Sequence, residues 1–440
     1  MSTDFESFSG KRVTVAGLGR FGGGIAVTRW LCSQGASVLV TDLDSAENLA
    51  DSLEQLKDLP IELRLGEHRE EDFASADLVV ASPAIPPQNP FIQAARATGK
   101  TVTTEIRLFV ERCPAKIIGV TGTKGKSTTT AMLGKILAAT GKTWVGGNIG
   151  KSLLADLDKI KKDDRVVLEL SSYMLEHLRE LRWSPHVAVV TMISQDHLPW
   201  HGSLEAYLDA KRNIVRFQQA DDFAVLNEED PGSASFAHLA AGKIILYGTE
   251  NRAKFKLLIP GVHNQLNAQG AFTAASIFGA DFGQAQKALS DFVGLPHRLQ
   301  LVHELAGVRY FNDSIATIPE AAIAALLSFP SKKVIHIVGG YGKDIQIKAM
   351  CATLIERAKA VLCIGTSGPE IADLLEQSVS QSAAATYRCG DLATAVGIAK
   401  QIAVSDDIVL LSPGFKSYDQ FVNFEQRGDE FVKLIEQAAK

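Results

Sequence analysis

Residues 119–130 read GVTGTKGKSTTT. The apolar run IIGV at 117–120, the glycines and the Lys-Ser-Thr start of a helical pattern predict a strand, a glycine-rich bend and a helix in direct succession. Gly119, Gly122 and Gly125 would let backbone N–H groups converge on an anion, and the positive end of the helix would point at the same place. Lys126 supplies a mobile charge, and Ser127 or Thr128 supplies a hydroxyl for a phosphate-bound Mg²⁺. The stretch therefore predicts a phosphate-binding loop.

The match to G-x-x-x-x-G-K-[ST] is imperfect, because Val120 occupies the position five residues before Gly125. The alternative interpretation is a solvated Gly/Lys turn between a strand and a helix. The upstream strand pattern and the downstream helical pattern, both in register with GKST, favour the phosphate loop.

Runs of Val, Ile and Leu alternate with helical patterns on both sides of this loop, which favours parallel sheets covered on both faces. The 440 residues exceed a single core, so we expect three α/β domains. These are a Rossmann-like N-terminal domain (1–112), a central P-loop ATPase domain with a parallel sheet (113–296) and a Rossmann-like C-terminal domain (297–440). Two local expectations are that Pro296 ends a helix and that a final helix covers 419–439.

Composition excludes several classes of function. The formal net charge is −5 with acidic and basic residues interspersed, so neither nucleic acid nor a membrane surface is an expected partner. The five cysteines are scattered without a close pair, which is typical of a reducing compartment. The polar N-terminus and the lack of a run of about 18 apolar residues predict a soluble, cytoplasmic protein.

The N-terminal domain carries GLGRFG at residues 17–22, which satisfies G-x-G-x-x-G after a strand, with Asp42 at the end of the next strand. Alone, this pattern predicts a dinucleotide site and an NAD-dependent oxidoreductase. That alternative leaves GKST and the last domain without a role.

Polar residues follow the strands of the central domain. Glu169 comes directly after a buried-strand pattern, where it would hold Mg²⁺, although a capping or surface acid is the alternative. Asp196 and His197 follow the next strand, and Lys211 lies fourteen residues after His197 on a predicted helix. A lone His is more often structural, and a surface lysine is the alternative interpretation of Lys211.

Two further clusters bear amides and charges. Asn264 and Asn267 are three residues apart at the start of a long helix, where both would hydrogen bond a base or a ribose, or cap the helix. The last domain places Arg298 at its start, Asp313 after a strand, and Lys343 in GGYGKD. Such basic groups at strand ends suit an acidic substrate.

In chain order, TGTKGKSTTT, GGNIG, LELSSYMLEHL, DHLPWHG, GVHNQLN, NDSIAT, GGYGKD and LSPGFKSYDQFVNFEQRGDEF resemble the Mur ligases of peptidoglycan synthesis, and among them the MurD type. The resemblance covers the chain from about residue 12 to its end and all three domains. It implies an ATP-dependent, ADP-forming amide ligase that adds D-glutamate to UDP-N-acetylmuramoyl-L-alanine. The carboxylate of that substrate would become an acyl phosphate, which the amine of glutamate would then attack.

The resemblance also implies roles for individual residues. The UDP-linked substrate would be bound by Gly17, Leu18, Gly19, Arg20, Phe21, Asp42, Ser82 and Asn148. ATP would be bound by Gly122, Thr123, Lys124, Gly125, Lys126, Ser127, Thr128, Asn264, Asn267, Arg298 and Asp313. The incoming amino acid would be held by Lys343, Ser417, Tyr418 and Phe424.

Two Mg²⁺ ions are implied, held by Ser127, Glu169, His197 and a carbamylated Lys211, with Lys126, His197 and Lys211 as the catalytic residues. A monomer acting on small molecules is expected. The chain departs from the family pattern at three places. Ile315 stands where many members carry lysine, so L-glutamate or another amino acid remains an alternative substrate; Lys124 stands where asparagine is common, and DHLPWHG replaces a DHLDRH-like run.

Overall fold

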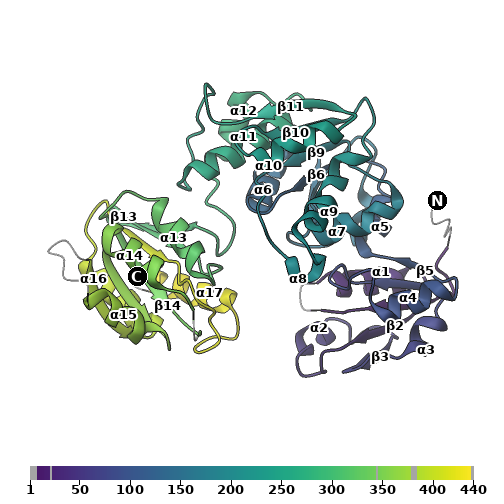
Figure 1. The fold of residues 1–440 in the computed structure, drawn as a ribbon, viewed down its shortest axis with the longest axis horizontal. Coiled ribbons are helices and arrows are strands. Elements are labelled where there is room, and N and C mark those ends of the chain that lie inside the picture. The colour runs from purple at the N-terminus through teal and green to yellow at the C-terminus, as the bar shows by residue number, and fades with distance from the viewer. Residues whose placement is uncertain (1–6, 20–21, 343–344, 378–383, 438–440) are drawn as a thin grey trace. The chain divides into compact units, whose positions relative to one another are not determined.

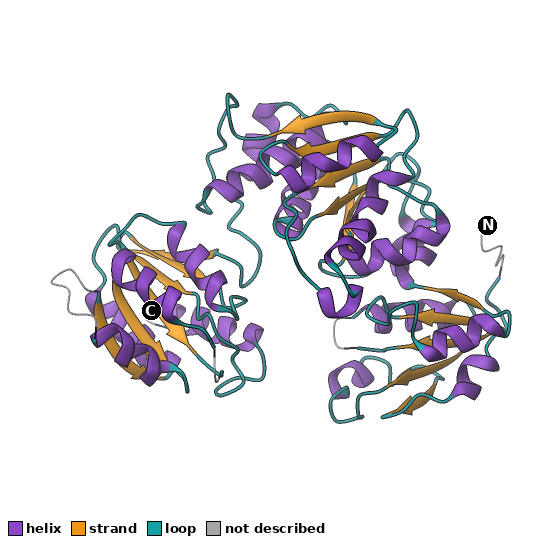
Figure 2. Ribbon diagram, viewed as in Figure 1, coloured by secondary structure: helices purple, strands orange, loops and turns teal. Residues whose placement is uncertain are grey.

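A computed structural model describes residues 7–19, 22–342, 345–377 and 384–437 and contains three β-sheets in this part of the chain (Figure 1). The residues group into two compact units, Met1–Ala253 with Leu266–Lys287, and Lys254–Gln265 with Ala288–Lys440. The first unit holds two sheets and the second unit holds the third. Helices lie on both faces of each sheet (Figure 2), as the alternating sequence pattern predicts.

The first sheet is parallel with strand order β3-β2-β1-β4-β5. Its strands are β1 (Arg12–Ala16), β2 (Ser37–Asp42), β3 (Glu62–Leu65), β4 (Leu78–Ala81) and β5 (Thr101–Thr103). Its helices are α1 (Gly23–Ser33), α2 (Ala50–Glu54), α3 (Glu70–Ala74), α4 (Pro90–Ala97) and α5 (Glu105–Val110). Helix α5 is buried throughout and joins a hydrophobic core that continues into the second sheet.

The second sheet is also parallel, with order β11-β10-β9-β6-β8-β7. Its strands are β6 (Lys116–Thr121), β7 (Thr143–Gly147), β8 (Arg165–Glu169), β9 (Val187–Val190), β10 (Phe223–Asn227) and β11 (Lys243–Tyr247). The helices of this part of the chain are α6 (Lys126–Ala138), α7 (Ser172–Leu178), α8 (Leu198–His201), α9 (Leu204–Arg216), α10 (Pro231–Ala234), α11 (Val262–Ser276) and α12 (Phe282–Leu289), with 3₁₀ turns η1 (Leu154–Lys159), η2 (Arg179–Leu181) and η3 (Ser235–Leu239).

The third sheet has order β12-β13-β17-β14-β15-β16, in which only the β12–β13 hairpin is antiparallel. Its strands are β12 (Gln300–Leu305), β13 (Val308–Asn312), β14 (Val334–Gly339), β15 (Ala358–Ile364), β16 (Ala385–Gly390) and β17 (Ile408–Leu411). Its helices are α13 (Pro319–Leu327), α14 (Lys348–Arg357), α15 (Gly368–Glu376), α16 (Leu392–Ile402) and α17 (Phe424–Glu436).

In the first sheet the strand order reverses between β1 and β4, and in the second sheet it reverses between β6 and β9. The loops after β1 and β6 therefore lie at the crevices where α/β sheets bind ligands. These are the GLGRFG loop and the phosphate loop. The predicted α/β fold with three sheets is confirmed, whereas the boundaries 112/113 and 296/297 stay predictions.

Two local predictions are wrong. Helix α12 ends at Leu289, seven residues before Pro296, so the proline lies in the following turns and does not end the helix. The last helix begins at Phe424 and not at 419. Residues Gln420 and Phe421 instead turn back to the carbonyl of Ser417, and the side chain of Asn423 caps the helix by accepting from the Gln426 N–H.

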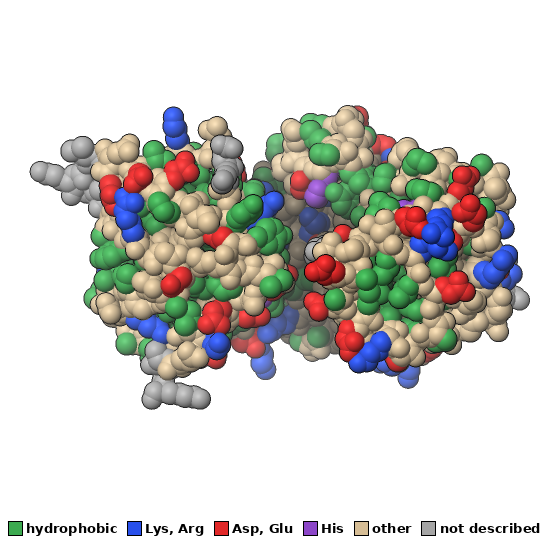
Figure 3. Space-filling view, turned by 90° about the horizontal axis from the view of Figure 1, so that it is seen from below, with side chains coloured by type: hydrophobic (Ala, Val, Ile, Leu, Met, Phe, Trp, Pro, Cys, Tyr) green, Lys and Arg blue, Asp and Glu red, His purple; other side chains and the backbone are tan. Residues whose placement is uncertain are grey.

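Acidic and basic side chains are interspersed over the face of each unit that Figure 3 presents. This distribution fits the small net charge of −5. Among the described residues, no helix is both long and apolar enough to cross a membrane.

Candidate active site

The phosphate loop lies between β6 and α6. Gly125 is the N-cap of α6 with φ 87°, a left-handed conformation that glycine adopts without strain. Gly122 has φ 154°, and a Cβ there would lie 1.9 Å from the Thr191 hydroxyl oxygen. The Nζ of Lys126 donates to the Thr123 carbonyl at 3.0 Å, while Ser127 and Thr128 lie in the first turn of α6. The loop and helix therefore have the predicted arrangement.

Gly119 does not belong to the loop, contrary to expectation. It lies inside β6, where a Cβ would meet Pro185 at 2.8 Å and Leu170 at 2.9 Å, so its role is close packing in the sheet. The strand also includes Val120. The departure from the phosphate-loop pattern thus falls on a buried strand residue, before the bend begins.

Residues after β9 support the loop from the other side. The Thr191 hydroxyl donates to the Lys124 carbonyl at 2.6 Å. The Thr123 hydroxyl lies 2.9 Å from the Ser194 carbonyl and 2.8 Å from the hydroxyl of Tyr207 on α9. Lys124 itself is exposed, so its backbone holds the loop while its side chain reaches solvent.

Glu169 ends β8, next to β6 in the sheet, and is 1% exposed. Its Oε1 accepts from the Asn148 Nδ2 at 2.9 Å, but its buried Oε2 has no hydrogen-bond partner in the described chain. The surface-acid alternative is therefore wrong. An unpaired buried carboxylate oxygen is costly unless a cation meets it, so this oxygen fits a Mg²⁺ ligand.

Lys211 projects from α9 toward the phosphate loop and is 2% exposed, so the surface-lysine alternative is wrong. Its Nζ donates to the Gly122 carbonyl at 2.6 Å and lies 4.9 Å from the ring centroid of Tyr207. Burial, and then the nearby Lys126 charge, hold the pKa of Lys211 well below its ordinary value. The amine that faces the loop therefore loses its proton more readily than an exposed lysine does.

His197 precedes α8 with φ 50°, and its ring lies 4.9 Å from the Tyr173 ring. Its Nε2 is 3.5 Å from the Asp196 carboxylate. Burial lowers the pKa of His197, and the charges of Lys126 and Lys211 act in the same direction. Within the described residues, no three His, Cys, Asp or Glu side chains lie close enough to hold a metal ion. A metal here would need oxygen ligands of other kinds, such as the Ser127 hydroxyl and phosphate oxygens.

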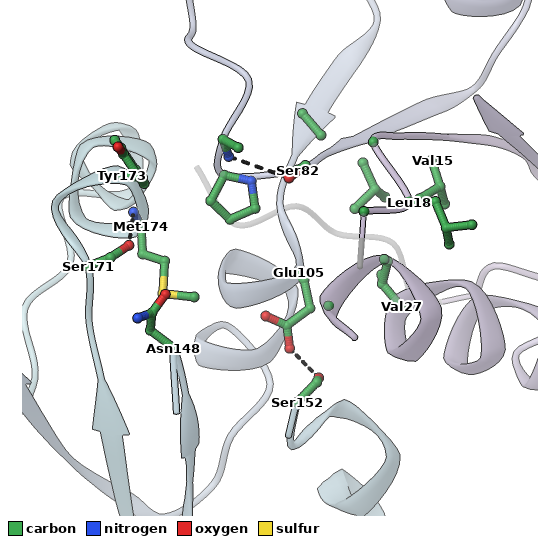
Figure 4. A pocket seen from close by; sticks show the side chains of 18 of the residues that line it. Val15, Leu18, Val27, Ser82, Glu105, Asn148, Ser152, Ser171, Tyr173 and Met174 are labelled. Atoms are coloured by element: carbon green, nitrogen blue, oxygen red, sulfur yellow. Dashed lines mark hydrogen bonds between the residues drawn. The ribbon is translucent and has the colours of Figure 1, made fainter. Parts of the chain in front are cut away.

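A pocket of about 350 Å³ lies within the first unit, where the loops after β1 and β4 meet residues that follow β7 and β8 (Figure 4). Five residues predicted to bind the UDP-linked substrate line it, namely Gly17, Leu18, Gly19, Ser82 and Asn148. Asp42 does not line it; the Asp42 carboxylate accepts from the Gly19 N–H at 3.0 Å and so supports the loop. Arg20 and Phe21 lie outside the described residues.

Another residue that lines the pocket, Glu105 at the start of α5, was not predicted as a site residue. Figure 4 shows its carboxylate in the pocket, where it accepts a hydrogen bond from the Ser152 hydroxyl. Burial raises the pKa of Glu105. The pocket thus contains a carboxyl group that keeps its proton to a higher pH than an exposed carboxyl group does.

The two asparagines of α11 differ in their surroundings. The Asn267 Oδ1 accepts from the Thr129 hydroxyl at 3.3 Å, and a Cβ on Gly125 would lie 2.5 Å from this Oδ1. Asn267 therefore reaches the phosphate loop. Asn264 donates through Nδ2 to the Pro260 carbonyl at 2.6 Å, a local contact in the second unit.

In the second unit, Asp313 follows β13 and is 6% exposed. Its carboxylate accepts from the Ser412 hydroxyl at 2.7 Å and from the Leu299 N–H at 3.0 Å. Burial raises the pKa of Asp313 to about 7, partly offset by these hydrogen bonds and by the charge of Arg298. Arg298 therefore lies near enough to act on Asp313, and the binding of ATP by these two residues stays a prediction.

Three of the four residues predicted to hold the amino acid, Ser417, Tyr418 and Phe424, follow β17. Ser417 is buried, Tyr418 is 63% exposed with its ring 6.4 Å from that of Tyr341, and Phe424 begins α17. Tyr341 pairs with Lys416 as an isolated bridge, which brings the residue after Gly340 beside the loop after β17. Lys343 lies outside the described residues.

Family models match the three sheets in turn. Residues 11–104 match the Mur ligase MurD-like N-terminal domain, residues 120–257 match the Mur ligase middle domain, and residues 297–415 match the Mur ligase glutamate ligase domain.

Proteins named UDP-N-acetylmuramoylalanine--D-glutamate ligase are similar over nearly the whole chain. The relative from Roseiflexus sp. (strain RS-1) is 40% identical, with 97% of this chain and 99% of the relative covered. The relative from Symbiobacterium thermophilum is 36% identical, with 97% and 98% covered.

Solved structures share the fold at lower identity. The UDP-N-acetylmuramate-alanine ligase MurC from Thermotoga maritima has a TM-score of 0.62 at 22% identity, covering 98% of this chain and 100% of that one. MurF ligase from Thermotoga maritima, in complex with ADP, has a TM-score of 0.57 at 18% identity, covering 100% and 98%. With its three sheets, its phosphate loop and these full-length relatives, the chain belongs to the Mur ligase family and to its MurD type.

Proposed function

We propose that this protein is an ATP-dependent, ADP-forming amide ligase that adds D-glutamate to UDP-N-acetylmuramoyl-L-alanine during peptidoglycan precursor synthesis. The observation that carries the proposal is the convergence of Lys126, Glu169 and Lys211 on the phosphate loop. The Lys211 Nζ contacts the Gly122 carbonyl, and the charges of Lys126 and Glu169 both influence the pKa of Lys211. A phosphoryl-transfer site needs such closely placed charges because the transferred group carries several negative oxygens.

ATP would bind through Gly122–Thr128, with the Lys126 ammonium on the phosphates and Asn264, Asn267, Arg298 and Asp313 contributing elsewhere on the nucleotide. The unpartnered Glu169 Oε2 supports a Mg²⁺ site shared with Ser127. The lowered pKa of Lys211 supports carbamylation, since only an unprotonated amine reacts with CO₂, and the resulting carbamate together with His197 would hold a second ion. Bound Mg²⁺ would offset the negative charge of the phosphates.

The UDP-linked substrate would occupy the pocket between the GLGRFG loop and Asn148. Backbone N–H groups of the glycine loop suit a diphosphate; Ser82, beside that loop, and Asn148, which follows β7, offer further hydrogen bonds. We propose further that Arg20, Phe21 and Asp42 act at this site. The L-alanyl carboxylate would then attack the γ-phosphate of ATP, and the acyl phosphate formed would be attacked by the amine of glutamate.

The amino acid would be held by Lys343, Ser417, Tyr418 and Phe424. The Ile315 side chain carries no positive charge to bind the carboxylates of the incoming amino acid. Whether the enzyme uses D- or L-glutamate therefore needs a direct test. We expect ATP, Mg²⁺ and UDP-N-acetylmuramoyl-L-alanine to give phosphate release with D-glutamate and not with L-glutamate. Release with neither enantiomer would sink the ligase assignment, and release with L-glutamate alone would move it to the L-adding chemistry.

We also propose that the protein acts in the cytoplasm as a monomer on small molecules, with no nucleic acid or membrane as partner. The interspersed surface charge supports this proposal. Light scattering on the purified protein should give the mass of one chain, 47.3 kDa, and twice that mass would contradict it.

A further inference from the structure

Two side chains from helices beside the second sheet hydrogen bond to adjacent carbonyl groups in the loop after β4. The indole Nε1 of Trp200, on α8, donates to the Ala84 carbonyl at 2.8 Å. The Nε2 of His177, on α7, contacts the Ile85 carbonyl at 3.2 Å. Both contacts join the first sheet to the second, over sequence separations of 116 and 92 residues.

The His177 contact is a donated hydrogen bond at neutral pH. His177 is 5% exposed, and burial lowers its pKa to about 4, so the ring is neutral. A neutral imidazole has one N–H, and the Ile85 carbonyl can only accept, which assigns that proton to Nε2. The interaction is therefore not lost by deprotonation above neutral pH.

Trp200 also packs against the opposite wall of the pocket. Its ring centroid lies 4.7 Å from that of Tyr173 and 4.5 Å from that of His201. Tyr173 lines the pocket from the start of α7, whereas Ala84 lines it from the loop after β4. Trp200 thus contacts one residue on each side of the cavity.

We propose that Trp200 and His177 form a latch between the first two sheets, which fixes the separation of the pocket walls and so positions the nucleotide-linked substrate. Both are positioning residues, because neither lines the pocket itself. The inference deepens the proposed function and rests on it: the ligand is a uridine-diphosphate-linked sugar acid. If the latch were lost, the loop carrying Ser82 and Ala84 would no longer be held against α7.

Trp200→Phe tests the latch, with Trp144→Phe as a matched control. Both changes keep an aromatic ring and remove one indole hydrogen bond. Trp144 lies on β7, and its indole N–H donates to the Asp164 carboxylate at 2.8 Å. We expect Trp200→Phe to raise the dissociation constant of UDP-N-acetylmuramoyl-L-alanine, and its KM, about fivefold, as for one lost hydrogen bond. The KM for ATP and for glutamate should stay unchanged, and Trp144→Phe should change none of these values.

His177 provides a second pair of variants of similar shape. His177→Gln keeps an N–H donor for the Ile85 carbonyl, whereas His177→Met removes it. The methionine variant should weaken nucleotide binding and the glutamine variant should restore it, which a purely structural role would not produce. This pair decides the question if Trp200→Phe does not fold.

Calorimetry with UDP-N-acetylmuramoyl-L-alanine, and with UDP alone, separates the two proposals. Unchanged affinity in both Trp200→Phe and His177→Met would overturn the latch, even with normal turnover in the wild type. Weakened binding in these variants, with a wild type that binds nucleotide but releases no phosphate, would keep the latch and overturn the ligase function. A wild type that binds neither nucleotide would overturn both.

Discussion

The Nζ of Lys211 lies 2.6 Å from the carbonyl oxygen of Gly122, so a lysine on α9 contacts the bend of a phosphate loop 89 residues earlier. Burial and the charge of Lys126 lower the pKa of Lys211. Two carboxylates, Glu169 and Asp196, raise it. Burial dominates, so the pKa of Lys211 is lowered and the amine loses its proton more readily than an exposed lysine does. The unprotonated amine is the nucleophilic form of lysine.

Lys211→Ala should lower kcat at least about a hundredfold, as for the loss of a group that stabilises transferring charge. If the carbamate is the active form, acetate should restore part of the activity, whereas chloride at equal ionic strength should not. Lys211→Arg is the control, because it keeps a cation that cannot be carbamylated and should stay inactive with acetate. Turnover is measured as phosphate release, and an alanine variant with wild-type turnover would refute the role.

Glu169→Gln should raise the Mg²⁺ concentration for half-maximal activity at least about tenfold. The glutamine can keep the hydrogen bond from Asn148, but it loses the charge at the unpartnered Oε2. Glu176→Gln serves as the control, since Glu176 is a partly buried carboxylate on α7 that pairs with Arg179 at 3.4 Å. A Mg²⁺ titration of activity measures the effect; equal midpoints in the two variants would remove Glu169 from the metal site.

The sequence predicts which candidate residues lie at the ends of strands. It does not predict whether a long side chain is buried or in which direction it points. Glu169 follows a run of Val and Leu, so its place at the carboxyl end of a buried strand follows from the pattern alone. The residues of α9 on either side of Lys211 are both apolar and charged, so the sequence does not show which way its side chain points. Tertiary packing places it against the phosphate loop. One signal was available, because Tyr207 lies four residues earlier and so on the same helix face.

The contacts of the pocket depend on pairing between distant segments. Trp200 and His177 bind carbonyls of the loop after β4, and a backbone acceptor leaves no mark in a sequence. Glu105 was missed for a similar reason, since its only described hydrogen bond comes from Ser152, 47 residues later. Motifs with a fixed local geometry, such as the phosphate loop, were found because their chemistry is local.

Asp313→Asn should change how the stability of the second unit depends on pH. The folded-state pKa of Asp313 is raised from 3.8 to about 7, so the folded chain holds a proton that the unfolded chain releases. The contribution of Asp313 to the free energy of unfolding is therefore most favourable below pH 3.8. It falls as pH rises toward about 7, by up to about 4 kcal/mol in total. Asparagine avoids this loss, because its Oδ1 can accept from the Leu299 N–H while its Nδ2 donates to the Ser412 hydroxyl oxygen.

Urea unfolding at intervals between pH 4 and pH 8 measures the effect. The difference in unfolding free energy between Asp313→Asn and the wild type should grow in favour of the variant up to about pH 7 and then level off. A difference that is constant with pH would show that Asp313 is ionised in the folded chain throughout.

Arg427, on α17, is 1% exposed and connects two loops of the third sheet. Its guanidinium donates to the Ser314 hydroxyl at 2.9 Å, to the Ser314 carbonyl at 2.8 Å and to the Phe415 carbonyl at 3.0 Å. Burial lowers the pKa of Arg427 to about 10, so it stays charged at neutral pH. The loop after β17 that carries Ser417 is thus fixed to the loop after β13.

Arg427→Met should lower the unfolding free energy by about 2–4 kcal/mol, because it leaves two buried carbonyl groups without donors. Arg427→Lys restores charge but not the planar fork that reaches three acceptors, so it should recover only part of this loss. In the lysine variant the KM for glutamate should rise while the KM for the UDP-linked substrate stays constant, because only the loop bearing Ser417 is displaced. Steady-state kinetics with each substrate varied in turn checks this, and an equal rise in both KM values would mean that Arg427 stabilises the chain without shaping the amino-acid site.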